Sequence, residues 1–259
     1  MTYGSNPRPF SLNALGYRVL RLAASRCCGI LWSSLNTLPN NDYRPMTSEL
    51  SLNIREQIEK GVSILRQDGI VAYPTDTVYG LGASVGLAQA VERIYEVKER
   101  PRNMPLPLLL ADDSQITGLT ESVPPVARLL IRNFWPGALT LVLAASASVP
   151  DIITAGGKTV ALRIPAHPVP VALAKGLETP LVGTSANLSG WPNPLTAEEV
   201  CSQFGSKIDF VIDGGRCPGG RESTLVDVTG VTPLILREGA ISRQELEKVL
   251  GSIDSKKGD

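Results

Sequence analysis

The sequence predicts one α/β domain built on a twisted, mixed β-sheet that helices flank. Short apolar segments of strand length alternate with amphipathic segments along the chain, without an internal repeat or a low-complexity linker after about residue 50. The 259 residues suit a domain of roughly 200 residues plus a tail. The 43% of apolar residues supply a sizeable core. We therefore expect a catalytic domain at 50–251, after a disordered extension at 1–45 and before a flexible tail at 252–259.

Helices are predicted where apolar residues recur three and four positions apart, or where capping signals open a segment. Asn53–Glu56 has the pattern of a capping box that begins the first helix, and Asp68-Gly69 ends it. The other expected helices are Leu87–Lys98, Val126–Asn133, Val169–Lys175 and two that begin at the capping boxes Thr196-x-x-Glu199 and Ser242-x-x-Glu245.

Strands are predicted from short apolar runs that lie between these helices. Pro105 and Pro107 indicate that the second run lies at a sheet edge or begins irregularly. The expected strands are Ile70–Tyr73, Leu106–Leu110, Leu139–Leu143, Val160–Ile164, Leu181–Gly183, Phe210–Ile212, Leu225–Val228 and Leu234–Leu236.

Composition excludes several classes of protein. Lys+Arg and Asp+Glu balance at 25 each, which argues against bulk electrostatic binding of nucleic acid but allows a local basic pocket. Four cysteines without C-x-x-C spacing and one histidine predict neither a structural zinc site nor a disulfide scaffold, so we expect no protein metal site and a reducing compartment. The apolar stretch 138–147 is too short to span a membrane.

The first 41 residues contain no acidic residue, and they include Arg8, Arg18, Arg21 and Arg26 among serines and apolar residues. This composition is typical of a transit peptide and predicts import into a mitochondrion or plastid. The alternative is an ordinary disordered extension. Met46 offers a second start, which would give a shorter product in the cytoplasm.

Polar and basic residues gather in four loops beside predicted strands, where ligands bind in open α/β sheets. Residues 74–82 combine two threonines with glycines. Residues 98–106 place Lys98, Arg100 and Arg102 within five positions, an arrangement that would bind phosphates well. Residues 159–168 hold Arg163 inside an apolar strand, where it needs a protein carboxylate or a substrate anion. Residues 183–190 are small and polar. Segments 219–224 and 236–239 add hydroxyls and a further arginine.

Structural explanations compete with binding in each loop. Residues 74–82 also suit a capped turn between a strand and a helix, and the cations of 98–102 suit a solvated helix end. His167, between Ala166 and Pro168, is predicted to be structural.

Three sharper motifs are absent. Gly157-Lys158-Thr159 imitates a P-loop, but Ile152 stands where the first glycine is required. Gly183-x-Ser185 imitates a nucleophile elbow, but Asn187 replaces the last glycine and the histidine precedes the serine. Paired carboxylates in a glycosidase context are also missing.

Six segments occur in the order that is typical of one family: PTDTVYGLG (74–82), K-x-R-P (98–101) followed by PL (105–106), LRIPAHP (162–168), TSANLSG (184–190), ESTLVD (222–227) and LREG (236–239). Together they resemble the YrdC-domain family, the threonylcarbamoyl-AMP synthases. The resemblance implies a single YrdC/RibB-like domain with a concave basic cavity. It also implies a nucleotidyltransferase that condenses ATP, L-threonine and bicarbonate to threonylcarbamoyl-AMP and pyrophosphate. Mg²⁺ is expected with the ATP, a threonylcarbamoyl transferase complex acts downstream, and tRNA is bound indirectly or weakly.

The resemblance also assigns roles to residues of this chain, with Lys98 and Arg100 as the catalytic pair. It places ATP against Lys98, Arg100, Thr159, Ser185, Asn187, Asn193 and Arg237. It places L-threonine against Thr77, Arg163, Gly183 and Ser223. Two positions depart from the family pattern: Met104 stands where many relatives have lysine, and Leu109 where some have histidine.

Two alternatives remain at this point. A non-catalytic RNA-binding protein could use the same basic cavity, although the balanced charge and the lack of interleaved aromatic and basic residues disfavour it. A RibB-like sugar-phosphate lyase would need acidic metal ligands and a general base, which the sequence does not place.

Overall fold

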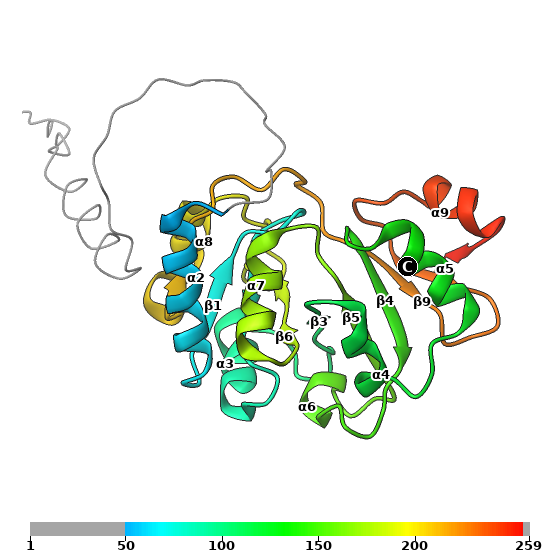
Figure 1. Ribbon diagram of the computed structural model, residues 1–259, viewed down its shortest axis with the longest axis horizontal. Helices are drawn as coiled ribbons and strands as arrows, with labels where there is room; N and C mark the ends of the chain where they lie inside the picture. Colours follow the sequence, from blue (N-terminus) through cyan, green and yellow to red (C-terminus); the bar gives the residue numbers. More distant parts are fainter. Residues whose placement is uncertain (1–49, 256–259) are drawn as a thin grey trace, which may run out of the picture.

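The computed structural model describes residues 50–255, and Figure 1 shows their course. The predicted transit peptide, the extension at 1–45 and the second start at Met46 lie outside the described residues, as do 256–259. Within the described part, strands and helices alternate along one α/β unit, which confirms the predicted fold class.

Backbone hydrogen bonds divide the strands into two mixed sheets. The larger sheet has the order β11-β10-β9-β4-β5-β3-β6, with β3 (Leu108–Leu109), β4 (Leu139–Ala144), β5 (Thr159–Arg163), β6 (Leu181–Val182), β9 (Thr224–Asp227), β10 (Leu234–Arg237) and β11 (Asp254–Ser255). The smaller sheet has the order β7-β2-β1-β8, with β1 (Val71–Tyr73), β2 (Gly80–Gly82), β7 (Thr184–Ser185) and β8 (Phe210–Val211).

The two sheets meet at β6. Ser84, just after β2, forms an isolated antiparallel bridge with Leu181. The Val182 amide also donates to the Ala83 carbonyl at 2.9 Å. The chain then runs from β6 in the larger sheet directly into β7 in the smaller one, so loops of both sheets converge at this junction.

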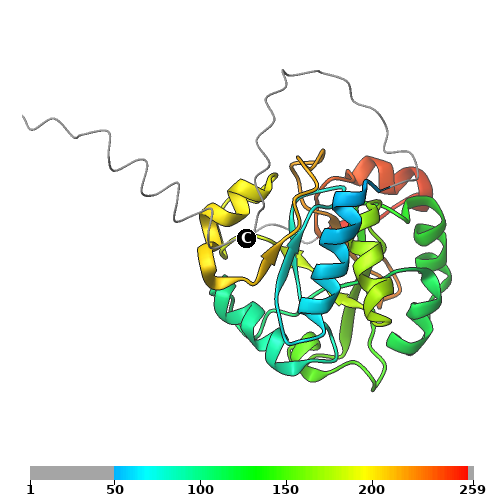
Figure 2. The same ribbon diagram turned by 60° about the vertical axis from the view of Figure 1, so that its left-hand side comes forward.

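Helices cover the sheets on both sides. α2 (Leu52–Leu65) and α7 (Pro168–Leu177) lie side by side in Figures 1 and 2 and pack on each other. The remaining helices are α3 (Ala88–Lys98), α4 (Ile116–Leu119), α5 (Pro125–Phe134), α6 (Asp151–Thr154), α8 (Ala197–Phe204) and α9 (Arg243–Leu250), with short 3₁₀ turns at Asp113–Gln115 and Gly205–Lys207.

The core has two parts. A large cluster of buried side chains extends from α3 through both sheets to α9. A smaller cluster, which includes Leu65, Tyr73, Leu109 and Leu173, lies beneath α2 and α7. No helix of the described residues is both long and apolar enough to cross a bilayer.

The cap of the first helix differs from the prediction. Ser51 is the N-cap of α2, because its Oγ accepts a hydrogen bond from the Ile54 amide at 3.4 Å, so the predicted capping box at Asn53 is wrong. The predicted box at Thr196 is half formed: Thr196 accepts from the Glu199 amide, while the Glu199 carboxylate bonds to Leu195.

The capping box at Ser242 is complete in the structure, as predicted. Its Oγ accepts from the Glu245 amide, and the Glu245 carboxylate accepts from the Ser242 amide at 2.8 Å.

Strand predictions erred at the prolines and in the ligand loops. β3 keeps only Leu108 and Leu109 of the predicted strand 106–110. It pairs with β5 and β6, so the predicted edge position is wrong, but it begins only after Pro107, in line with the predicted alternative of an irregular start. β2 and β7 lie within segments that were predicted as loops. The fold also continues past residue 251, because Ile253 is buried and β11 pairs with β10.

Burial along α2 generates a stability prediction. Leu65 is completely buried in the smaller cluster, so Leu65→Ala should lower the free energy of unfolding by about 2–5 kcal/mol through a cavity. Leu52 on the same helix is 77% exposed, and Leu52→Ala should change the free energy of unfolding by less than about 0.5 kcal/mol. Urea unfolding of both variants measures the difference. Equal losses would contradict this account of the helix packing.

Candidate active site

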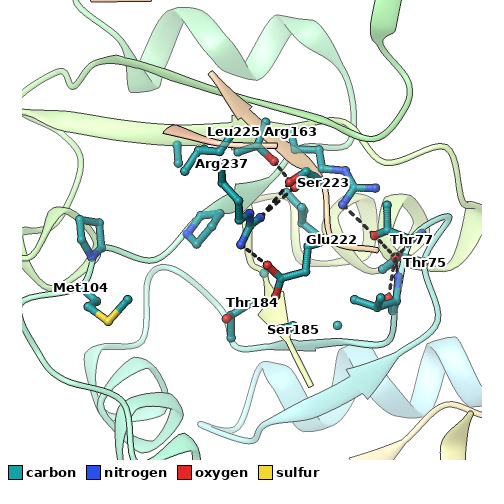
Figure 3. A pocket seen from close by; sticks show the side chains of 18 of the residues that line it. Thr75, Thr77, Met104, Arg163, Thr184, Ser185, Glu222, Ser223, Leu225 and Arg237 are labelled. Atoms are coloured by element: carbon teal, nitrogen blue, oxygen red, sulfur yellow. Dashed lines mark hydrogen bonds and ion pairs between the residues drawn. The ribbon is translucent and has the colours of Figure 1, made fainter. Parts of the chain in front are cut away.

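One cavity of about 500 Å³ opens where the loops of the two sheets converge. Figure 3 shows that side chains from β5, β9, β10 and the loop before β2 point into the same space. Eight of the predicted site residues line this cavity: Thr77, Arg100, Thr159, Arg163, Gly183, Ser185, Ser223 and Arg237. The charged residues among the described lining residues are Arg100, Arg163, Arg237 and Glu222.

Arg163 ends β5 and is buried among apolar neighbours. Its Nη2 lies 2.6 Å from the Asp76 carboxylate, its Nη1 donates to Thr77 Oγ1 at 3.2 Å, and its Nε donates to the Gly137 carbonyl at 2.8 Å. Burial lowers the pKa of the guanidinium, and Asp76 opposes that shift. The anionic partner that the sequence required is thus a protein carboxylate, and three of the five N–H groups of Arg163 are used in these bonds.

A threonine turn presents Thr77 to this arginine. Thr75 Oγ1 accepts from the amides of Thr77 and Val78 at 3.0 and 3.2 Å and lies 2.6 Å from the Val78 carbonyl. The single hydroxyl proton of Thr75 therefore goes to that carbonyl. Thr77 Oγ1 lies 2.9 Å from Thr75 Oγ1 and accepts from Arg163 Nη1. The capped turn and the polar pocket wall are one structure.

Arg237, at the end of β10, belongs to a second polar group in the cavity. Its Nη1 forms an ion pair with the Glu222 carboxylate, and its Nη2 donates to the Ser223 carbonyl at 3.0 Å. Figure 3 shows the Arg237–Glu222 pair. Ser223 Oγ lies 2.7 Å from Thr140 Oγ1 on β4. The Arg237 side chain from β10 and two hydroxyls, one on β4 and one on the residue just before β9, are thereby fixed together.

Arg100 is held at the cavity by backbone carbonyls. Its Nη2 donates to the Pro105 carbonyl at 2.9 Å, and its Nε to the Met104 carbonyl at 3.4 Å. The Tyr95 hydroxyl donates to the same Met104 carbonyl at 3.0 Å. Burial lowers the pKa of Arg100, and the neighbouring Arg237 adds to this shift. The Met104 side chain is 45% exposed at the rim and brings an apolar surface there.

Lys98 is placed differently from the prediction. It does not line the cavity, and its side chain is buried beneath the loop that follows β7. Its Nζ donates to the carbonyls of Ser185 and Asn187 at 2.5 and 2.6 Å and lies 3.4 Å from Asn187 Oδ1. Burial, with Arg100 adding to it, lowers the pKa of Lys98 to about 7. Contact with a phosphate would require these bonds to break, so in this structure Lys98 is a brace for the loop.

The two asparagines also lie behind the cavity wall. Asn187 Oδ1 accepts from Ser185 Oγ at 2.6 Å, and its Nδ2 donates to the Trp191 carbonyl at 2.7 Å, so it supports the loop. Asn193 does not line the cavity, and its buried Oδ1 has no hydrogen-bond partner among the described residues. Direct contacts of either residue with ATP are not visible in this geometry.

Gly183 and Leu109 form a close contact in the cavity wall. A Cβ at position 183 would lie 2.4 Å from Leu109 Cγ, so only glycine fits beside this leucine. The Gly183 amide donates to the Pro107 carbonyl at 2.9 Å. Leu109, one of the two residues that depart from the family pattern, therefore shapes the cavity wall at Gly183.

Sequence reasoning missed the two carboxylates of the site. Asp76 and Glu222 each pair with one arginine of the site, Arg163 and Arg237 respectively. Both acids belong to the segments that carry the resemblance, and the demand of an arginine in an apolar strand for an anion was the signal for Asp76. Thr75, one of the two threonines predicted at 74–82, does line the cavity, whereas Thr140 was not singled out because a hydroxyl within a strand carries no distinctive pattern.

The described residues do not support a protein metal site or a catalytic histidine at the cavity. Residues 50–255 contain no group of three or more His, Cys, Asp or Glu side chains that could hold a metal ion. His167 caps α7, where its Nδ1 accepts from the Val169 amide at 3.3 Å, and burial lowers its pKa to about 4. The histidine is therefore neutral near pH 7 and structural, as predicted.

An α/β domain with arginines and hydroxyls around a strand-end cavity belongs to the class of proteins whose sites suit small anionic molecules. Comparison with known families identifies it further: the Sua5/YciO/YrdC family model, described as "Telomere recombination", matches residues 63–239. The chain belongs to this family.

Curated relatives carry a more specific name. Threonylcarbamoyl-AMP synthase of Pyrococcus abyssi is 44% identical over 207 residues, which cover 78% of this chain and 61% of the relative. The enzyme of the same name from Bacillus subtilis is 43% identical over 217 residues, which cover 82% of this chain and 62% of the relative. The chain thus spans about three fifths of the length of these two relatives.

Solved structures share the fold. P. abyssi Sua5 complexed with L-threonine matches with a TM-score of 0.75 and 43% identity, over 77% of this chain and 58% of that one. E. coli YciO matches with a TM-score of 0.67 and 31% identity, over 74% and 93% of the two chains. These neighbours confirm the twisted mixed α/β fold.

The buried lysine generates a pH prediction. Its pKa is about 7 when folded, below its ordinary value, so from pH 7 upward the unfolded chain binds more protons and stability should rise. Between pH 7 and 8.5, the wild-type free energy of unfolding should gain roughly 1–2 kcal/mol over that of Lys98→Met, by integration of this linkage. The window ends below the ordinary pKa of Cys217, which burial raises.

Denaturant titrations at several pH values measure this difference. Lys158→Met removes an exposed lysine and should leave the wild-type slope unchanged. Parallel slopes for wild type and Lys98→Met would show that Lys98 does not release its proton in this range.

Proposed function

We propose that this chain is an L-threonylcarbamoyladenylate synthase, which condenses ATP, L-threonine and bicarbonate to threonylcarbamoyl-AMP and pyrophosphate. The observation that carries the proposal is one cavity that presents Arg163 and Arg237 from separate strands, each with its own hydroxyl partner. Such a cavity suits two anionic substrates held at once. The names of the relatives at 43–44% identity and the threonine complex of P. abyssi Sua5 support it.

The amino acid would bind at the Arg163 end. The two N–H groups of Arg163 that are not used by Asp76, Thr77 or Gly137 would receive the threonine carboxylate. Gly183 provides a wall without a side chain close to Leu109. Ser223, which contacts both Thr140 and Arg237, would complete this end where it meets the nucleotide end.

The nucleotide would bind at the Arg100 and Arg237 end. These two guanidiniums would contact the phosphates, and Thr159 and Ser185 would add hydroxyls from β5 and β7. The rim formed by Met104, Pro105 and Pro107 offers an apolar surface to the base. Lys98, Asn187 and Asn193 would act through the loop after β7.

The chemistry requires positioning more than a reactive side chain. The threonine amine and bicarbonate give a carbamate and water, and a carbamate oxygen then attacks the α-phosphorus of ATP while pyrophosphate leaves. Both reactants are anions, so the arginines would lower their mutual repulsion and align them. None of the lining residues needs to form a covalent bond.

Mg²⁺ would enter with the nucleotide. The donor set fits such an ion, because one carboxylate among the described residues lines the cavity and Mg²⁺ on ATP needs few protein ligands. When bound, it would neutralise charge on the triphosphate. Glu222, already paired with Arg237, is the cavity carboxylate within reach of that end.

Transfer of the threonylcarbamoyl group to tRNA would fall to a separate transferase complex.

The alternative function, RNA binding without catalysis, would use the same arginines. It accounts less well for Arg163, which is buried and faces a small cavity instead of an extended groove. The predicted mitochondrial, plastid or cytoplasmic location also stays a proposal.

Pyrophosphate release tests the activity. The full chain with ATP and Mg²⁺ should release pyrophosphate only when L-threonine and bicarbonate are both present. Omission of either substrate should reduce release to background, because the carbamate is the attacking group. Release without threonine would contradict the proposal, and so would its absence from a folded protein that binds ATP.

Separate arginines predict separate kinetic defects. Arg163→Ala should raise the apparent KM for threonine, and Arg237→Ala that for ATP, each by roughly 10- to 100-fold for the loss of a charged hydrogen bond. Arg221→Ala, which removes an exposed arginine near the cavity, is the matched control and should change neither. Equal increases in both KM values for each folded variant would refute the division of the cavity.

A further inference from the structure

Glu222 is the one carboxylate among the described residues that line the cavity. Its side chain is 26% exposed, and its Oε2 pairs with Arg237 Nη1. Figure 3 shows the Glu222 carboxylate directed towards the Arg237 guanidinium. Glu222 also acts electrostatically on Lys98 and Arg100, so one anion of the chain lies among three cations.

This arrangement puts an acid where an anionic ligand must bind. A phosphate that approaches Arg237 Nη1 meets a carboxylate oxygen on the same nitrogen. Nη2 is used by the Ser223 carbonyl and lies 3.5 Å from Ser223 Oγ. A bound phosphate must therefore displace Glu222 or share the arginine with it at a repulsive distance.

Another arginine of the cavity, Arg163, provides a contrast. Arg163 is also paired with an acid, but Asp76 lies outside the cavity lining and is 15% exposed. A ligand in the cavity can therefore reach Arg163 without displacement of Asp76. The competition between ligand and carboxylate is confined to the Arg237 end.

We propose that Glu222 is an internal competitor of the ligand phosphates for Arg237, and that it holds the affinity of the cavity for polyphosphate below the value that its arginines alone would give. The inference rests on the proposed polyphosphate site and adds a residue that sets its affinity. Weaker binding of polyphosphate favours release of pyrophosphate after each turnover. Because the pair is partly exposed, the competition should weaken as salt rises.

Isothermal titration of the full chain with pyrophosphate, without Mg²⁺, tests the proposal. Glu222→Gln keeps the shape of the side chain and removes its charge, and it should bind pyrophosphate about three- to tenfold more tightly, as expected for a partly exposed pair. The gain should shrink at high salt. In an Arg237→Gln background, Glu222→Gln should change the affinity for pyrophosphate little, because the arginine for which the carboxylate competes is absent. Glu222→Ala serves as the second variant if Glu222→Gln does not fold.

Glu238→Gln is the matched control. It removes a neighbouring negative charge, but the Glu238 side chain accepts from the Arg243 amide and does not line the cavity, so pyrophosphate affinity should stay near that of wild type. Equal or weaker binding by Glu222→Gln would overturn the proposal. A gain that persists undiminished without Arg237 would also overturn it, since the effect would then be long-range.

Two further outcomes separate this inference from the proposed function. A wild-type chain that binds pyrophosphate, with no gain in Glu222→Gln, contradicts the inference alone. If wild type and Glu222→Gln both fail to bind pyrophosphate, the polyphosphate site itself is wrong. Repetition with Mg²⁺ distinguishes a metal ligand from a competitor, because loss of Mg²⁺-dependent affinity in Glu222→Gln would mean that Glu222 binds the ion, and this would overturn the inference.

Discussion

The ion pair between Arg163 and Asp76 is the constraint on which the site depends. Arg163 must be charged, yet it ends a strand whose neighbours are buried, so it requires an anion nearby. Asp76 supplies that anion from the threonine turn that joins β1 to β2 in the smaller sheet. The pair therefore ties the two sheets together at the cavity. It also fixes the direction in which Thr77 can offer its oxygen.

Around this pair the wall of the cavity is built from both sheets. β4, β5 and β10 provide hydroxyls and arginines from the larger sheet, and β7 with the loop before β2 provides hydroxyls from the smaller one. The passage of the chain from β6 into β7 makes the junction continuous. Lys98 stabilises that junction from behind, since its ammonium is shared between two carbonyls of the loop.

Much of the fold could be predicted from the sequence, because the apolar periodicity of long segments such as Leu87–Lys98 is specific to a helix. The errors have physical causes. β2 and β7 are short and rich in glycine or small polar residues, so their pairing is set by tertiary contacts that no local pattern encodes. The N-cap of α2 is Ser51 and not Asn53. Both residue types are favoured at N-caps, so the sequence does not show which of two nearby residues begins the helix.

The site follows the same logic. Motifs predicted which segments meet, and eight of the assigned residues do line the cavity. What they could not give is which partner satisfies each charge. Lys98 was assigned to phosphates because lysine near arginine and proline suits them, but burial beside two carbonyls gives its donors other partners. Glu222 was passed over, although an acid beside Arg237 changes how strongly that arginine can hold a ligand. The affinity of such a cavity depends on its internal carboxylates as much as on its cations.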